Sequence, residues 1–190
     1  MIRSTLIVAL LAFSASATAQ DLNYTFINAT YGNVDFDDSI LDVDGSGFGL
    51  AGSVGFTDNF HAFAEYQTAA MDFDVDLNIL EAGIGYNHGL SDTVDIIGRL
   101  SYVDVEASAP GVPSDSEDGY AAGVGIRAAL TQMVELNGGV DYVDFSESGS
   151  ETRINAGIQL NFTESISAGL KGVFWDDVTV LQLNARFYFQ

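Results

Sequence analysis

Apolar and polar positions alternate along most of the chain, in runs of about ten residues separated by turns. In the run 120–130, every second residue from Tyr120 to Leu130 is apolar, and the residues between them are Ala, Gly or Arg127. Side chains alternate between the two faces of a β-strand, so each run predicts a strand with one oily face and one small or polar face. Nine runs follow this pattern: 48–56, 60–68, 80–86, 94–102, 120–130, 134–142, 154–162, 166–174 and 179–189.

Charged residues are confined to one of the two phases. The apolar phase of the nine runs contains no Asp, Glu, Lys or Arg, whereas a water-soluble β-sandwich need not exclude every charge from its core face. Complete exclusion is typical of a surface that faces lipid. The pattern therefore predicts an all-β protein, a transmembrane antiparallel up-and-down β-barrel with a polar interior.

The number of strands follows from a tenth, less regular run and from the connections. Residues 22–31 alternate without showing which phase faces lipid, and with them the count is ten, an even number as expected of a bacterial barrel. Short connections face the periplasm in this class and longer ones face outward. The short connections are 57–59, 89–92, 131–132 and 163–164; the longer ones are 32–45, 69–76, 107–118 and 146–150, with a brief fifth near Asp176.

The aromatic residues test this topology, because they gather at the two membrane interfaces of such barrels. Two girdles are predicted. The periplasmic girdle contains Phe56, Phe60, Tyr86, Phe162, Phe187 and Phe189, and the outer girdle contains Phe48, Tyr102, Tyr120, Tyr142 and Phe174.

The first nineteen residues have the features of a secretory signal peptide. Arg3 precedes an apolar stretch from Leu6 to Phe13, and residues 17–19 read Ala-Thr-Ala. We expect a signal peptide at residues 1–19 and a barrel domain at 20–190. Export, together with barrel patterning, predicts the outer membrane of a Gram-negative bacterium. The chain has no Cys, which excludes disulfides, thiolate metal sites and lipidation at a cysteine.

The chain is strongly acidic, with 27 Asp and Glu against 6 Lys and Arg and a net charge of −21. Such a chain repels phosphates, so we expect no nucleic-acid partner. The predicted outer loops hold many of the acids, which favours solubility and loose binding of divalent cations between these loops and lipid headgroups. Residues 42–47 match the opening of a calcium loop, but its twelfth position is Ser53 where a bidentate Glu is needed. We expect no defined metal or cofactor site.

The interior phase carries charges of both signs and predicts a belt of ion pairs across a narrow lumen. Unpaired charges in so confined a space are costly. Antiparallel pairing about the turn 89–92 predicts Glu81 opposite Arg99, with Glu65 near Glu81, and glycines in the same phase leave room for long side chains. Ten strands are close to the eight that enclose only side chains, so we expect no wide channel. The predicted belt consists of Glu65, Glu81, Arg99, Arg127, Glu135, Asp141, Arg153, Lys171 and Arg186.

An enzyme is the main alternative class, because hydrolysis usually needs a histidine beside a nucleophile or an activated water. His61 and His88 are the only histidines. Both fall at periplasmic ends and in opposite phases, so they cannot form one centre at the outer leaflet, and we expect neither to be a buried anchor. We therefore expect no catalytic site. The favoured function is a structural or surface-interaction role, a narrow pore is the alternative, and a lipid- or peptide-hydrolysing enzyme is less favoured.

Three segments carry a resemblance to a known family: residues 45–50 leading into the turn 56–60, residues 134–140, and the closing residues 185–189. They resemble the small porin-like outer-membrane β-barrels of Gram-negative bacteria, the group of opacity-type and OmpX-like barrels. The resemblance implies contact with outer-membrane lipid and lipopolysaccharide, insertion by the barrel-assembly machinery, and roles in adhesion, envelope integrity or limited permeability. Many relatives have eight strands, which is the alternative to ten. This chain departs from the group by ending in Gln190 after Phe189.

Overall fold

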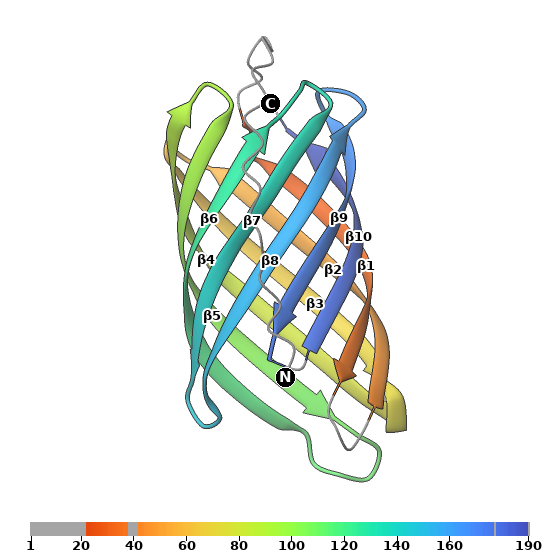
Figure 1. The fold of residues 1–190 in the computed structure, drawn as a ribbon. Helices are drawn as coiled ribbons and strands as arrows, with labels where there is room; N and C mark the ends of the chain where they lie inside the picture. The colour runs from red at the N-terminus through yellow and green to blue at the C-terminus, as the bar shows by residue number, and fades with distance from the viewer. Residues whose placement is uncertain (1–21, 38–41, 177, 190) are drawn as a thin grey trace, which may run out of the picture.

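The computed structural model describes residues 22–37, 42–176 and 178–189, which form one closed antiparallel barrel (Figure 1). Each strand pairs with its neighbours in sequence, and β1 closes the barrel against β10. Ten strands are confirmed, and the eight-stranded alternative is wrong. The predicted signal peptide, residues 1–19, lies outside the described residues. The strands are β1 (Phe26–Asp37), β2 (Asp42–Gly55), β3 (Phe60–Met71), β4 (Val75–Ser91), β5 (Val94–Ser108), β6 (Asp115–Ala129), β7 (Val134–Phe145), β8 (Gly149–Asn161), β9 (Ile166–Trp175) and β10 (Val178–Tyr188).

Helical structure in the described part of the chain is limited to η1 (Asp72–Asp74), a single 3₁₀ turn between β3 and β4. The described residues contain no helix with the length and hydropathy of a membrane span.

Most strands extend beyond the alternating runs at their outer ends. The β5–β6 ladder continues outward through Val105 opposite Glu117 to Ala107 opposite Asp115, within the predicted loop 107–118. Backbone groups pair wherever two strands run together, whether or not their side chains face lipid. The alternation of apolar and polar residues therefore marks only the part of each strand that faces lipid. The strands themselves are longer than the alternating runs.

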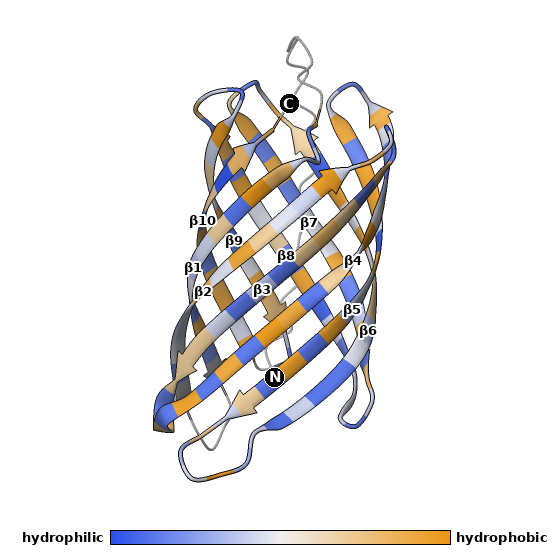
Figure 2. Ribbon diagram, turned by 180° about the vertical axis from the view of Figure 1, so that it is seen from behind, coloured by the Kyte–Doolittle hydropathy of each residue, from blue (hydrophilic) through white to orange (hydrophobic). Residues whose placement is uncertain are grey.

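The two faces of the barrel wall differ as the pattern predicted, and Figure 2 shows the hydropathy alternating along the strands. The structure also resolves the facing of β1. Ile27 and Tyr31 are 48% and 46% exposed on the outer surface, whereas Asn28 and Thr30 are buried on the inner one. The lipid-facing phase of β1 thus contains Ile27, Ala29 and Tyr31.

Aromatic rings meet at both rims of the lipid-facing band. At the periplasmic rim, the Phe60 ring lies 6.2 Å from that of Phe56 and 5.0 Å from that of Tyr86. At the outer rim, the rings of Tyr102 and Tyr120 are 5.8 Å apart. These contacts join neighbouring strands and agree with the predicted girdles.

One predicted pairing is wrong. Glu81 lies opposite Val103, and Arg99 lies opposite Gly85, because β4 continues to Ser91 before the chain turns. The register therefore differs by four residues from the prediction. Four is even, so every side chain keeps its predicted face. The predicted neighbourhood of Glu65 and Glu81 is confirmed by their direct pairing.

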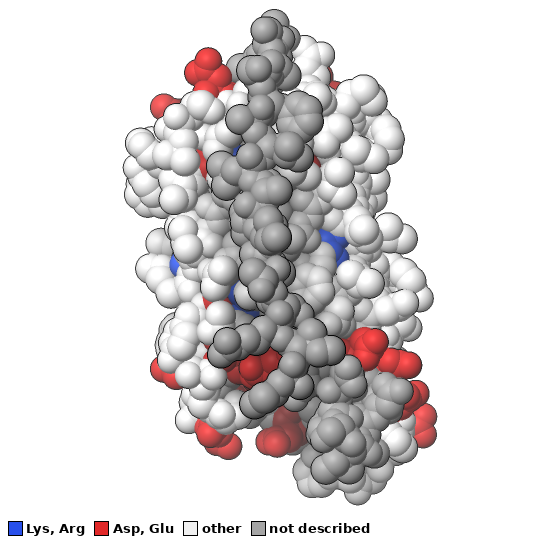
Figure 3. Space-filling view, viewed as in Figure 1, with Lys and Arg blue, Asp and Glu red and all other residues white. Residues whose placement is uncertain are grey.

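Acidic side chains gather mainly at the end of the barrel with the longer connections, while Lys and Arg appear only in small patches at mid-height (Figure 3). One of these acids, Glu117, holds the turn between β7 and β8. Its carboxylate accepts hydrogen bonds from the Ser148 hydroxyl (2.7 Å) and from the backbone N–H groups of Ser148 and Glu147. These donors stabilise the ionised form and hold the pKa of Glu117 below its ordinary value.

Candidate functional site in the barrel lumen

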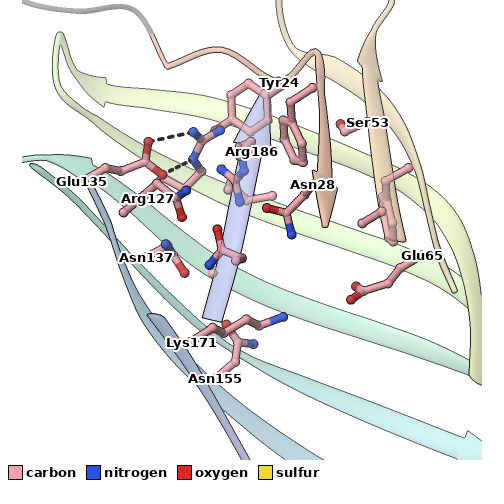
Figure 4. Close-up of a pocket in the computed structure, with 18 of the residues that line it drawn as sticks. Tyr24, Asn28, Ser53, Glu65, Arg127, Glu135, Asn137, Asn155, Lys171 and Arg186 are labelled. Carbon is pink, nitrogen blue, oxygen red and sulfur yellow. Dashed lines mark hydrogen bonds and ion pairs between the residues drawn. The ribbon is translucent and has the colours of Figure 1, made fainter. Parts of the chain in front are cut away.

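The lumen contains two adjacent chambers. The lower chamber lies toward the end with the short connections, which we predict to be periplasmic, and has a volume of about 190 Å³. The upper chamber lies toward the end with the longer connections and has a volume of about 140 Å³. The words lower and upper refer to the barrel with its predicted outer end above; Figures 1 and 4 draw it the other way up. The two chambers share seven lining residues, among them Glu65, Arg99 and Lys171. The lumen is therefore a chain of small cavities, far narrower than the aqueous channel of a 16-stranded porin.

An ion pair between β6 and β7 forms the floor of the lower chamber (Figure 4). The Arg127 guanidinium donates two hydrogen bonds of 2.8 Å to the Glu135 carboxylate, and these residues are only 7% and 3% exposed. Arg127 also donates to the carbonyl oxygen of Asn23, at 3.1 Å. Paired, parallel N–H···O bonds of this kind are among the strongest that side chains form.

Tyr24, which precedes β1, covers this floor from inside the barrel. Its ring lies 4.6 Å from the Arg127 guanidinium carbon and stacks on the His61 ring of β3 at 4.7 Å. Its hydroxyl donates a hydrogen bond of 2.8 Å to the Asp95 carboxylate of β5. One side chain thus contacts three strands besides its own segment, at the periplasmic end of the lumen.

Two further ion pairs cross the middle of the lumen. Arg99 of β5 contacts Asp141 of β7 at 2.6 and 2.8 Å, and Arg153 of β8 contacts Glu81 of β4 at 3.2 Å. The prediction that Glu81 pairs with Arg99 is therefore wrong. The lumen is narrow enough for these side chains to reach partners on strands that are not their neighbours. Gly123 leaves room for the Asp141 carboxylate, since a Cβ at this position would overlap its Oδ1.

Two of the five lumen bases form no ion pair with the described residues. Arg186 donates a hydrogen bond to the Tyr188 hydroxyl at 3.2 Å and lies 4.2 Å from the centre of the Phe26 ring. Lys171 makes no hydrogen bond or ion pair with the described residues. Glu65 accepts a hydrogen bond from Gln67 but likewise lacks a cationic partner there. Some charges of the predicted belt thus form ion pairs, and others have no partner of opposite charge in the described residues.

The structure places all nine residues of the predicted belt in the chamber walls. Arg127, Glu135 and Arg186 line the lower chamber, and Glu81, Asp141 and Arg153 line the upper one; Glu65, Arg99 and Lys171 line both.

The histidines behave differently from each other. His88 is exposed on the outer face, where its ring lies 6.5 Å from that of Tyr86. His61 points into the lumen and is only 5% exposed, so the expectation that neither histidine is a buried anchor is wrong for His61. The reason is Gly85 on the neighbouring strand, where a side chain would overlap the imidazole.

Tyr24 and His61 are the functional candidates that sequence reasoning missed. Tyr24 shares its phase with the lumen-facing Asn28, but the sequence did not show which phase of the run 22–31 faces the lumen. The described residues contain no group of three or more His, Cys, Asp or Glu side chains suited to hold a metal ion. Loose cation binding at the outer loops stays a prediction.

Comparison with known sequences identifies the family. Residues 5–165 match the outer membrane protein beta-barrel domain, and the chain belongs to this family of outer-membrane barrels. A search of curated proteins found no match.

Solved structures agree with the fold. The translocator domain of the autotransporter NalP from Neisseria meningitidis aligns with a TM-score of 0.53 at 11% identity, over 90% of each chain. The NanC porin aligns with a TM-score of 0.50 at 9% identity, over 86% of this chain and 99% of its own. At these identities, the likeness concerns the fold alone.

Proposed function

We propose that this outer-membrane barrel is a non-enzymatic component of the cell envelope, with a structural or surface-interaction role and a lumen closed at its periplasmic end. The observation that carries the proposal is the interlock of Tyr24 with Arg127, Asp95 and His61, which covers the lower chamber. Its partners are outer-membrane lipid and lipopolysaccharide, which the exposed apolar band and aromatic rims suit, and the barrel-assembly machinery that inserts it.

Planar-bilayer recording tests whether the lumen is closed. We expect the unmodified protein to give small channels or none, because Tyr24 and the ion pairs obstruct the narrow lumen between its chambers. Tyr24→Ala removes the ring that joins three strands, and it should produce discrete openings. Tyr31→Ala is the matched control: it removes a tyrosine of the same region that faces lipid, and it should leave conductance unchanged. Large, steady conductance from the unmodified protein would contradict the closed lumen.

A narrow solute conduit is the second candidate, and it is favoured by the adjacency of the two chambers, which share seven lining residues. In that case the unmodified protein conducts steadily and Tyr24→Ala adds little, because Tyr24 would already leave a path open. The same recordings therefore separate the two candidates.

We further propose that the barrel has no lipid- or peptide-cleaving activity. The support is the placement of His61 in the lumen and His88 on the lipid side, since a hydrolytic centre needs its groups within hydrogen-bond reach. Changing both histidines to Gln should leave lipid A structure and surface proteolysis unaltered, as measured by mass spectrometry and peptide cleavage. The heat-dependent electrophoretic shift of barrels checks that the variant has folded. Loss of either activity in a folded double variant would contradict the proposal.

A further inference from the structure

The lower chamber is positively charged inside an otherwise acidic protein. The chain has six basic residues, and five of them point into the lumen. Four basic and two acidic side chains line the lower chamber, and three of each line the upper chamber. Arg127 and Arg99 are paired with Glu135 and Asp141. Lys171 and Arg186 against Glu65 therefore leave an excess of one positive charge in the lower chamber. Low-dielectric walls strengthen such a field, so an anion gains most at the lower chamber.

The same chamber contains buried polar atoms that lack a partner. Five of them lie on one wall, formed by β10, β1 and β2, and a sixth, His61 Nδ1, lies on β3. Buried polar groups without partners are costly unless something else satisfies them. Three of the five on the wall are amide oxygens, which accept hydrogen bonds from hydroxyl groups or water. The five atoms are Asn28 Oδ1, Ser53 Oγ, Gln182 Oε1, Asn184 Oδ1 and Arg186 Nε.

The unpaired cation and the amides are neighbours. Lys171 of β9 lies directly opposite Gln182 of β10, and Asn184, the next inward residue of β10, lies opposite Thr30 of β1. Figure 4 shows the labelled Lys171, Asn28 and Arg186 around the same cavity. Its volume of about 190 Å³ far exceeds the ~10–15 Å³ that a single water needs on the same measure, so a small solute has room.

We propose that the lower chamber binds a small carboxylate that carries hydroxyl groups, entering from the outer end through the upper chamber. The Lys171 ammonium pairs with the carboxylate, the excess positive charge retains it, and the hydroxyls donate to the amide oxygens of Gln182, Asn184 and Asn28. The three amide oxygens of this wall then each receive a donor, and Lys171 receives a counter-charge. The site does not depend on whether the lumen conducts.

Isothermal titration of the folded protein in non-ionic detergent tests the site with two probes, D-gluconate and D-glucitol. They differ mainly in that a carboxylate replaces one hydroxymethyl group. We expect gluconate to bind at least about tenfold more tightly, in line with the free energy of hydrogen bonds to charged groups. Lys171→Gln should weaken gluconate by a similar factor and leave glucitol unchanged. Glu65→Gln removes the unpaired carboxylate and should tighten gluconate.

The matched control is the double variant Glu81→Gln with Arg153→Gln. It removes an ion pair of the upper chamber without changing the net charge of the lumen, and gluconate affinity should stay within about twofold of the unmodified protein. Glu65→Gln gives an effect of opposite sign, so general destabilisation cannot imitate the pattern. Equal affinities for the two probes, absence of gluconate binding, or an unchanged affinity in folded Lys171→Gln would each overturn the proposal.

Discussion

Ile126→Arg is expected to destabilise the folded barrel by about 2 to 4 kcal/mol, the cost of a cation on the lipid face near the middle of a bilayer. Ile126 is 46% exposed on the outer surface, between the outer girdle at Tyr120 and the periplasmic end of β6. Arginine there must leave water for hydrocarbon or distort the bilayer to reach the interface. Equilibrium unfolding by guanidinium chloride in phospholipid vesicles measures the difference.

Ser116→Arg is the matched control for this change. Ser116 lies on the same strand and in the same phase, but beyond the aromatic rim, where it pairs with Glu106. An arginine there stays in water, so its effect should be within about 0.5 kcal/mol. If Ile126→Arg cost no more than Ser116→Arg, the assignment of this face to lipid would be wrong.

The fold was predictable because lipid imposes a strict rule on one face of every strand. A single charge in the apolar phase would destabilise the inserted barrel and is therefore excluded. The number of strands and the face of each side chain can thus be predicted from the alternation of residues such as Val124 and Arg127. Strand ends and register are not subject to that rule. The pairing of Glu81 was therefore predicted four residues out of register, since backbone pairing continues to Ser91 through residues that no longer face lipid.

For the candidate site, the sequence predicted which charged residues lie in the lumen but not which of them pair. The face on which a side chain lies depends on its phase in the strand, so the nine charged residues of the belt could be placed in the lumen without a structure. Their partners depend on distances across the barrel, which no sequence spacing gives: Arg99 reaches Asp141 on a strand that is not its neighbour. The packing of the Tyr24 ring depends on contacts with three strands, and the burial of His61 depends on the space left at Gly85.

Glu135→Gln is expected to destabilise the barrel by roughly 3 to 5 kcal/mol, because it leaves the Arg127 guanidinium buried without its counter-charge. The pair is the most buried of the ion pairs in the described residues, and Arg127 also anchors Asn23 and the Tyr24 ring. The double variant Arg127→Met with Glu135→Leu removes both charges and fills the space with apolar atoms. It should cost less than Glu135→Gln alone, since no charge is left without a partner.

The more open pair of Arg153 and Glu81 provides the comparison that identifies burial as the cause. Its side chains are 19% and 17% exposed, and its contact is longer, at 3.2 Å. Water reaches Arg153 when its partner is neutralised, so Glu81→Gln should cost about 1 kcal/mol. The same unfolding measurements rank the three variants. If Glu81→Gln proved as costly as Glu135→Gln, or if the double variant cost the sum of its single changes, desolvation of Arg127 would not be what stabilises the periplasmic floor.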